Sequence, residues 1–424
     1  MSQSARRRRL DVLDTSSFHP RYVVWELTLA CDHACTHCGS RAGVARDTEL
    51  TTAQALAVVD ELAAMGAGEV VLIGGEAYLH EGFLDIVRAL AARSITPVMT
   101  TGGRALDAAL ARAMREAGLE RVSVSIDGLE ATHDLMRARR GSFADGMRAL
   151  AACREAGLGV SANTNLNRLN APDLEALYET LRDAGVRSWQ VQLTAPLGRA
   201  ADRPDLLLQP YDLLALLPRI AALKTRGLQE GLLLMPGNNL GYFGPEEGLL
   251  RSQRPEDGDH FGGCQAGRYV MGIESDGAVK GCPSLQTASY VGGHATRASL
   301  RSIWEDAPEL AFTRARTRAD LSGFCAECPY ADTCLGGCSF TAHSFFGRPG
   351  NDPYCHFRAL HHARRGLRER LVATDPASGR PFDHGLFELV VEPLDAPEPA
   401  APAREALVKI GRRPRRAERR REHA

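Results

Sequence analysis

From Tyr22 to about Leu193, the sequence repeats one pattern six times: a short apolar run followed by an amphipathic stretch. In the first amphipathic stretch Leu56, Val59 and Leu62 recur at helical spacing. This alternation is typical of parallel strands connected by helices. Six units predict an α/β fold of the partial (β/α)6 TIM-barrel type, with strands at residues 23–29, 70–73, 97–101, 122–126, 160–165 and 189–193.

The length of 424 residues exceeds what one ordinary core organises, so more than one domain is expected. Seven cysteines and many glycines follow the repeats, which predicts a small domain organised around inorganic centres. Pro and Ala dominate residues 393–403 and Arg dominates residues 412–421, a composition typical of disorder, although residues 386–391 resemble a strand. The expected segments are a basic extension (1–21), the partial barrel (22–199), a bridging region with one helix at 211–224 (200–263), the cysteine-rich domain (264–372) and a mostly disordered basic tail (373–424).

The overall charge and the termini limit the possible partners and locations. The formal net charge of −1 argues against a general nucleic-acid binder, which usually has a strongly basic surface. A basic run, residues 6–9, is not followed by an apolar stretch of signal-peptide or membrane-span length, so we expect a cytoplasmic protein with no membrane partner. Because the cytosol keeps thiols reduced, the eleven cysteines are not expected to form disulfides, and their clustered spacings fit metal or cluster ligation better.

Three of these cysteines, Cys31, Cys35 and Cys38, lie on the loop directly after the first expected strand. Parallel barrels place their reactive groups on such loops. A four-iron cluster needs four ligands, so three cysteines leave one iron open to an exogenous chelator. An isolated triplet also fits half of a zinc site.

The spacing Cys-x3-Cys-x2-Cys, together with Gly74-Gly75-Glu76 after the second strand, resembles the radical S-adenosylmethionine (SAM) superfamily. The likeness spans residues 22–199 and implies a catalytic [4Fe–4S] cluster that binds and reduces SAM. It also implies that His37, before the third cysteine, packs against adenine. The glycine pair would let backbone groups approach the ligand closely, and Glu76 would accept a hydrogen bond from the methionyl ammonium. The family usually has Pro after this glutamate, whereas this chain has Ala77.

A further stretch, residues 123–128 with the sequence Ser-Val-Ser-Ile-Asp-Gly, is similar to radical SAM enzymes that mature peptides and cofactors. By this resemblance Ser125 contacts SAM, and Asn165 and Gln192 meet its ribose and carboxylate or the substrate. Cys153 lies in the middle of an expected helix and is interpreted as a core residue.

The remaining seven cysteines follow the order of the SPASM extension of radical SAM maturases, and the resemblance covers residues 264–355. It implies two auxiliary iron–sulfur clusters. The outer cluster would be bound by Cys325, Cys328, Cys334 and Cys355, and the inner cluster by Cys264, Cys282 and Cys338. His260, Asp259 or the substrate are candidates for the fourth inner ligand. Two structural zinc ions are the alternative for the run from Cys325 to Cys338 alone.

The resemblance implies reductive cleavage of SAM to a 5′-deoxyadenosyl radical, which abstracts hydrogen from a substrate. The expected substrate is a ribosomally made peptide or protein, and the alternative is a haem or quinone cofactor precursor, because residues 23–26 (Val-Val-Trp-Glu) are similar to the haem-forming group. Sulfatase maturation is disfavoured by Pro283, where those relatives carry an acidic residue. An external one-electron reductant is required, and any leader-binding partner would be a separate chain. A non-catalytic iron–sulfur electron carrier or scaffold is the alternative from another class.

Overall fold

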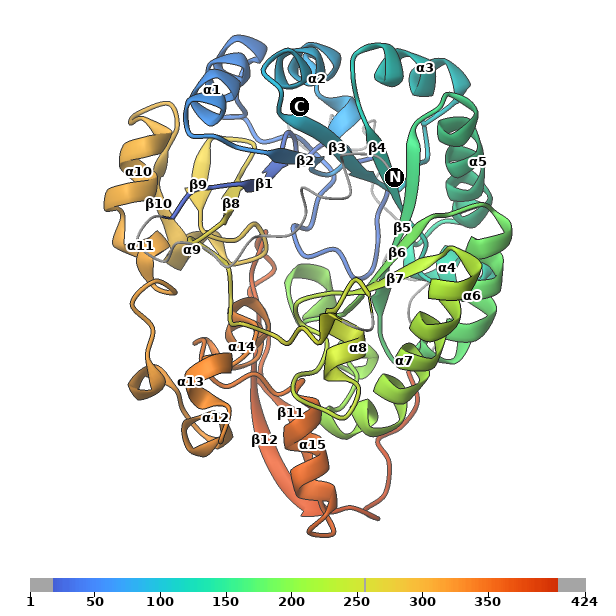
Figure 1. Ribbon diagram of the computed structural model, residues 1–424, viewed down its shortest axis with the longest axis vertical. Coiled ribbons are helices and arrows are strands. Elements are labelled where there is room, and N and C mark those ends of the chain that lie inside the picture. Colours follow the sequence, from blue (N-terminus) through green and yellow to red (C-terminus); the bar gives the residue numbers. More distant parts are fainter. Residues whose placement is uncertain (1–17, 255–256, 403–424) are drawn as a thin grey trace, which may run out of the picture.

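The computed structural model describes residues 18–254 and 257–402, and its centre is a curved ten-stranded sheet (Figure 1). In chain order the strands are β1 (Tyr22–Glu26), β2 (Glu69–Ile73), β3 (Thr96–Thr101), β4 (Arg121–Ser125), β5 (Gly159–Leu166), β6 (Ser188–Leu193), β7 (Leu233–Pro236), β8 (Val270–Ile273), β9 (Ala278–Lys280) and β10 (Val291–His294). Across the sheet the order is β10-β9-β8-β1-β2-β3-β4-β5-β6-β7. From β8 through β1 to β7 all neighbouring strands are parallel, whereas β9 is antiparallel to both β8 and β10. The sheet ends at β7 on one side and at β10 on the other and does not close, so the predicted partial barrel is confirmed.

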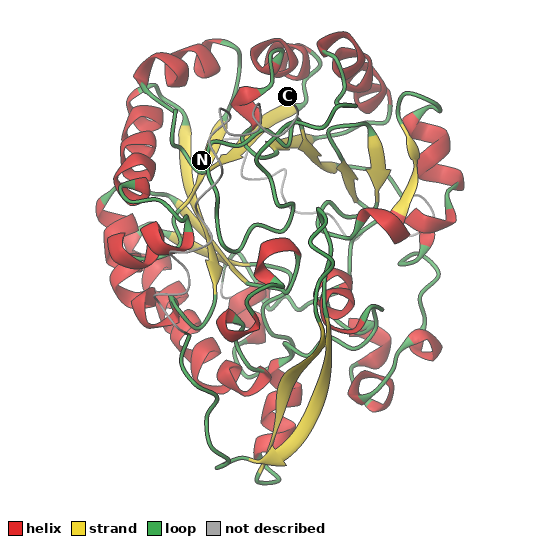
Figure 2. Ribbon diagram, turned by 180° about the vertical axis from the view of Figure 1, so that it is seen from behind, coloured by secondary structure: helices red, strands yellow, loops and turns green. Residues whose placement is uncertain are grey.

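Helices cover the outer side of the curved sheet, and the loops after the strands turn into its interior (Figures 1 and 2). The helices of the barrel are α1 (Thr52–Ala64), α2 (Phe83–Ala92), α3 (Ala108–Glu116), α4 (Glu130–Met136), α5 (Ser142–Glu155), α6 (Leu174–Asp183), α7 (Leu213–Glu230) and α8 (Glu247–Arg251). Those of the cysteine-rich part are α9 (Thr287–Tyr290), α10 (Leu300–Asp306), α11 (Pro308–Ala311), α12 (Phe324–Glu327), α13 (Ala331–Cys334), α14 (Ser339–Phe346) and α15 (His356–Ala363).

The two faces of the sheet differ in polarity, and the residue pattern of each strand explains why. In β4, Val122 and Val124 are fully buried in the main core, while the intervening Ser123 lies on the opposite face because strand side chains alternate. Strand β5 repeats this pattern with buried Val160 and Ala162. The apolar face packs against the helices, and the polar face lines the interior.

All six predicted strands are present, but the sheet has two more parallel strands than the sequence pattern indicated. Strand β7 lies in the expected bridging region and pairs with β6, after helix α7, which corresponds to the helix expected at 211–224. Strand β8 lies in the cysteine-rich region, and its Val270 pairs with Tyr22 of β1. Both strands have only four residues, too few for a periodic pattern to reveal them.

The expectation of a mostly disordered tail from residue 373 is wrong for residues 373–402. Strand β11 (Leu367–Asp375) pairs antiparallel with β12 (Leu386–Pro393) along nearly their full lengths. Beyond β12, Glu398 accepts hydrogen bonds of 2.6 Å from the Tyr211 hydroxyl and from the Arg368 guanidinium. Residues 373–402 are ordered because they contact distant parts of the chain, and composition does not reveal such contacts. The basic runs at 6–9 and 412–421 lie outside the described residues.

One described segment, residues 204–230, is long and apolar enough to cross a membrane. It contains α7, and 67% of its most apolar window is buried inside the protein, as in a core helix. Leu213, Leu217 and Ile220 of this helix are part of the main core.

We expect β12 to contribute to stability through Phe387. This side chain is buried, and its ring lies 5.2 Å from that of Phe345 in α14. Phe387→Ala should lower the free energy of unfolding by about 3 kcal/mol because it leaves a cavity. Val391→Ala, on the same strand but 52% exposed, should change it by less than about 0.5 kcal/mol. Urea unfolding measures both, and equal effects of the two variants would contradict the expectation.

Candidate active site and cluster-binding sites

The loop with the first three cysteines follows β1, and hydrogen bonds to its backbone fix it on both sides. Thr28 O accepts from Gly75 N (2.7 Å), and Ala30 O accepts from Glu76 N (2.8 Å). On the other side, the Arg199 side chain donates to Cys35 O (2.7 Å). This loop, residues 27–43, is called the cysteine loop below.

The structure brings Cys31, Cys35 and Cys38 together as free thiols. Burial raises the pKa of Cys31, and the other two thiolates would raise it further, which places the three sulfurs within electrostatic reach of one another. Cys35 Sγ accepts a hydrogen bond from Arg137 (3.4 Å). Three converging thiols with no disulfide fit three corners of an iron–sulfur cluster, whose binding would displace the thiol protons.

Gly74 and Gly75 allow the loop after β2 to lie directly against the cysteine loop. A Cβ atom on Gly75 would lie 2.1 Å from Ala30 O, and one on Gly74 would lie 2.3 Å from Thr28 O. Both distances are far shorter than any real contact, so the two backbones can approach only because the side chains are absent.

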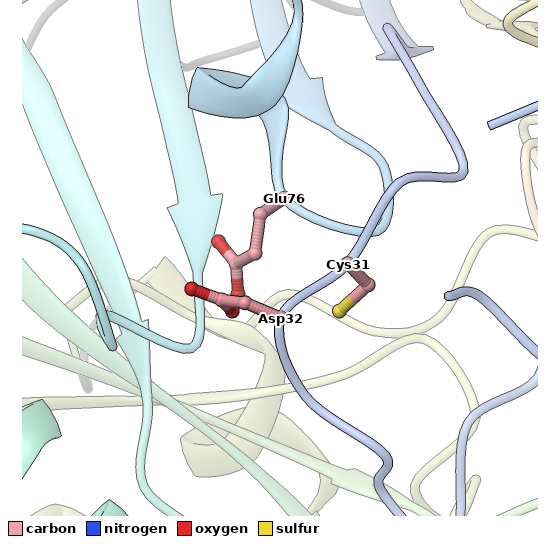
Figure 3. A group of neighbouring side chains, drawn as sticks. All are labelled: Cys31, Asp32 and Glu76. Atoms are coloured by element: carbon pink, nitrogen blue, oxygen red, sulfur yellow. The ribbon is translucent and has the colours of Figure 1, made fainter. Parts of the chain in front are cut away.

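Glu76 is 2% exposed and lies beside Cys31 and Asp32 (Figure 3). One sulfur or oxygen atom from each of these three residues lies within 4.8 Å of the others. Glu76 also accepts hydrogen bonds from Gly102 N (2.7 Å) and the Thr101 hydroxyl. Burial raises the pKa of Glu76 to about 7. The arrangement offers carboxylate acceptors next to a cysteine sulfur, which suits an ammonium group or a metal ion.

A cavity of about 340 Å³ opens beside Cys31. Its lining includes Asp32, His33, Arg104 and Arg139. Both ring nitrogens of buried His33 lack a hydrogen-bond partner within the described part of the chain. The cavity gives a small polar molecule access to the cysteine loop, and His33 offers it an unused donor and acceptor.

His37 lies with its edge toward β4, and two residues not selected from the sequence hold it there. Its Nε2 is 3.2 Å from Asp127 Oδ2, and Asp127 also pairs with Arg137 at 2.5 Å. Although burial opposes ionisation, the charges of Arg137 and His37 lower the pKa of Asp127. Arg137 therefore joins Asp127 to the Cys35 thiol. In the sequence, the signal for this arrangement was the Asp127-Gly128 pair after β4, followed by Arg137 at the end of α4.

The other predicted SAM contacts lie on adjacent strands of the interior face. Asn165 in β5 pairs in register with Gln192 in β6, and Asn165 N donates to Asp127 Oδ1 (2.9 Å). Ser125 is the last residue of β4, two positions before Asp127. The structure thus brings Asn165 to the His37–Asp127 pair and places Ser125 and Gln192 on the same half-buried face.

The four cysteines assigned to the outer cluster line one cavity, together with Tyr242, Phe243, Tyr330 and Phe357. They are Cys325, Cys328, Cys334 and Cys355. Burial raises the pKa of Cys334 to about 12, and the charges of Cys325 and Cys328 add to this effect. Four thiols around one apolar cavity match the complete ligand set of a [4Fe–4S] cluster.

The three cysteines assigned to the inner cluster also lie close to one another: desolvation raises the pKa of the Cys338 thiol, and the nearby charges of Cys264 and Cys282 raise it further. His260 instead packs its ring 6.0 Å from Phe243, which lines the outer cavity. Asp259 N donates to Ser252. The structure therefore gives neither fourth-ligand candidate a contact with the inner thiols among the described residues.

A hydrogen-bonded pair connects the two auxiliary sites. The Tyr242 hydroxyl donates to Asp352 Oδ2 (2.8 Å), and the same carboxylate accepts from Cys338 N (3.0 Å). Both side chains also line the outer cavity. Burial raises the pKa of Asp352 to about 7. The inner ligand Cys338 and the outer cavity thus share one pair of polar side chains.

Two family models match the chain: the radical SAM superfamily at residues 25–184, and the iron–sulfur cluster-binding SPASM domain at residues 264–329. This chain is a radical SAM enzyme with a C-terminal SPASM domain. Its cofactors are SAM, a [4Fe–4S] cluster in the radical SAM domain and auxiliary iron–sulfur clusters in the SPASM domain, and the converging thiols described above fit all of them.

The chain is also similar to individual radical SAM enzymes. It is 28% identical to the AdoMet-dependent heme synthase of Methanosarcina barkeri, over 80% of this chain and 97% of that protein. It is 29% identical to the mycofactocin maturase MftC of Mycobacterium ulcerans, over 79% of this chain and 88% of that protein.

Two solved structures share the fold of this radical SAM enzyme. Streptococcus suis SuiB bound to S-adenosylmethionine has a TM-score of 0.62 at 15% identity, covering 80% of this chain and 77% of SuiB. The anSMEcpe protein with bound AdoMet has a TM-score of 0.61 at 17% identity, covering 80% of this chain and 94% of the other.

We expect Gly75→Ala to disrupt the radical SAM site selectively. The added methyl group would displace the cysteine loop, and a misplacement of about 1 Å lowers catalysis by about 100-fold. Gly248→Ala in α8 is the matched control, because its nearest neighbouring atom would be 3.9 Å away. Formation of 5′-deoxyadenosine with SAM and dithionite measures the effect, and near-normal turnover by Gly75→Ala would contradict it.

The Arg137–Asp127 pair should also be essential for the stability of the site. Arg137→Met should lower the free energy of unfolding by about 3 kcal/mol, because it leaves the buried Asp127 charge without its partner. In an Asp127→Asn background the same change should cost less than about 1 kcal/mol. Arg88→Met, which breaks an exposed pair with Asp85, should cost less than about 0.5 kcal/mol. Anaerobic urea unfolding of the four variants checks this, and additive effects of the two buried changes would contradict it.

Proposed function

We propose that this radical SAM enzyme matures a ribosomally made peptide or protein by an oxidative reaction. Cys31, Cys35 and Cys38 would hold the catalytic cluster, which would supply SAM with one electron from an external reductant and so give methionine and a 5′-deoxyadenosyl radical. The substrate would lose a hydrogen atom from carbon to this radical, and then an electron and a proton. The auxiliary clusters would supply the acceptor for that electron, so the net change is a dehydrogenation or a new carbon–carbon or carbon–sulfur bond.

Residues around the cysteine loop orient SAM in this proposal. The converging oxygens of Glu76 and Asp32 receive the methionyl ammonium, and Gly74 and Gly75 allow the loop that carries Glu76 to lie against the cysteine loop. Asp127 holds the edge of the His37 ring, which fixes the ring whose face stacks on adenine.

The sheet supplies the remaining SAM contacts. Ser125, Asn165 and Gln192 extend a row of neutral polar side chains along the interior, to meet the ribose and carboxylate of SAM or the substrate.

The auxiliary domain would bind the two clusters that accept the substrate electron. Cys325, Cys328, Cys334 and Cys355 bind the outer cluster around their shared cavity. The inner cluster is bound by Cys264, Cys282 and Cys338. An open iron there would permit direct coordination of the substrate, whereas a fourth protein ligand would restrict the cluster to electron transfer.

The observation that carries the peptide proposal is the charge balance at the interior end of β1. Arg46 pairs with Glu26 and with Glu274 (2.9 Å), and Lys280 pairs with Glu274 (2.6 Å). Arg41 pairs with Asp202 (2.7 Å). Because these cations are already neutralised and the neighbouring strands offer hydroxyl and amide groups, the interior suits a neutral, amide-rich substrate better than a polycarboxylate.

The second candidate is a haem or quinone cofactor precursor. It is favoured by the likeness to the heme synthase over 97% of that protein and by the Val-Val-Trp-Glu sequence of β1. Both candidate functions need the same clusters and SAM, so they differ only in the class of substrate that binds. A separate leader-binding chain would serve the peptide candidate alone. A cytoplasmic location suits both, since the cytosol supplies the one-electron reductant.

The activity is tested by anaerobic reconstitution, iron counting and measurement of 5′-deoxyadenosine with SAM and dithionite. Wild type should hold about twelve irons, fewer if the inner centre has two. The Cys31, Cys35 and Cys38 triple alanine variant should lose about four irons and all 5′-deoxyadenosine. Cys153→Ala, which removes a buried core thiol, should match wild type. Zinc in place of iron, or no SAM cleavage by loaded protein, would instead support a carrier or scaffold.

The substrate class is tested with two probes under the same conditions: the small-peptide fraction of the source cells and Fe-coproporphyrin III. The proposal expects a peptide whose mass falls by about 2 Da only when SAM and active enzyme are present, as a dehydrogenation requires. A mass change in the porphyrin, with no change in any peptide, would overturn the peptide proposal and support the second candidate.

A further inference from the structure

The loop between β11 and β12, residues 376–385, extends from the SPASM side of the enzyme to the cysteine loop. Phe382 N donates to Gly39 O (3.2 Å), and Gly39 directly follows Cys38. Gly198 N donates to Asp383 O (2.7 Å). The Arg41 side chain donates to Asp383 Oδ1 (3.0 Å). A segment that sequence composition assigned to a disordered tail therefore contacts the loop that carries the catalytic cysteines.

The loop has a defined internal conformation. Asp383 Oδ2 accepts hydrogen bonds from the Ser378 hydroxyl and from Arg380 N, both 3.1 Å long. Phe382 has a φ angle of +54°, which costs a non-glycine residue free energy and persists only where the surroundings fix it. The bonds of Phe382 and Asp383 to the cysteine loop provide this constraint.

The Phe382 side chain points from this loop toward the auxiliary domain. Only 8% of the residue is exposed, and its ring centroid lies 4.6 Å from Lys280 Nζ and 6.0 Å from Arg46 Cζ. Lys280 ends β9 and lies two residues before Cys282 of the inner auxiliary site. Phe382 thus connects the catalytic cysteine loop, through its backbone, with the strand that leads to the inner cluster, through its ring.

The charged groups beneath the ring do not form a free binding site. Lys280 is fully buried, and Glu274 neutralises it and also pairs with Arg46. Glu26 is the second carboxylate of this group. Two cations and two carboxylates balance, so the buried ring covers a satisfied cluster of charges.

We propose that Phe382 forms one wall of the reaction space between the cysteine loop and the inner auxiliary site, and that it determines which hydrogen donors reach this space. A hydrogen donor must lie close to SAM at the cysteine loop, and Phe382 lies between this loop and the strand that leads to the inner auxiliary site. Its buried ring fills this position and so excludes bulk solutes. The inference rests on the radical SAM activity and not on the substrate class.

The test uses perdeuterated glycerol as an unnatural hydrogen donor, in reactions with SAM and dithionite but no substrate. Abstraction from glycerol transfers deuterium to the 5′ carbon of 5′-deoxyadenosine, and mass spectrometry measures the deuterated fraction. Phe382→Ala should raise this fraction by about tenfold over wild type, because the wall is removed. Phe382→Leu, which keeps an apolar side chain, should give an intermediate value, and Val391→Ala on the exposed face of β12 should match wild type.

A second measurement does not depend on turnover. The Gly198 amide, bonded to Asp383 O, should exchange with deuterated solvent several-fold faster in reconstituted Phe382→Ala than in wild type. If Phe382→Ala fails to fold or to hold its iron, the deuterated fraction and the Gly198 exchange are both measured on Phe382→Leu instead. If wild type makes no 5′-deoxyadenosine, the radical SAM activity is what fails, and the exchange of Gly198 decides the loop proposal. An unchanged deuterated fraction in an active, loaded variant, or unchanged exchange where turnover is absent, would overturn it.

Discussion

The backbone contact between the loops after β1 and β2 is the constraint on which the catalytic site depends. Gly75 N and Glu76 N donate to Thr28 O and Ala30 O, and the absent side chain of Gly75 makes this approach possible. The contact fixes the position of Cys31 relative to Glu76, so one pair of hydrogen bonds brings a thiol and a carboxylate into a single site. Arg199 and Arg137 then hold the same loop from the side of β6 and β4.

The auxiliary domain is joined to this site through the sheet and not through a flexible connection. Strand β8 continues the barrel next to β1, and β9 leads from it directly to Cys282. The inner auxiliary site and the cysteine loop therefore follow neighbouring parts of one sheet. On the opposite side, the Tyr242–Asp352 pair continues the connection to the outer cavity, so strands and hydrogen bonds connect all three groups of cysteines.

The sequence predicted the elements that depend on local pattern. Six strands follow from the period of the apolar residues, and the structure has them where expected. The division of the cysteines into ligand sets was implied by the family resemblance, and it stays a prediction that the proximity of the thiols supports. Strands β7 and β8 are too short to show a period, and β8 pairs with β1, which lies near the other end of the sequence. The His37–Asp127–Arg137 arrangement and the Phe382 loop depend on contacts between segments that are distant in sequence, which composition cannot show. In the tail, tertiary partners such as Tyr211 overcame a composition that favours disorder.

The pairing of Tyr22 with Val270 has a consequence for how the chain is made. While the ribosome is still synthesising the barrel, the outer edge of β1 has no neighbour, and an open strand edge is prone to pair with other chains. The strand that precedes the cysteine loop is therefore paired on both sides only after β8 has been synthesised, and the cysteine-rich domain completes the sheet of the barrel.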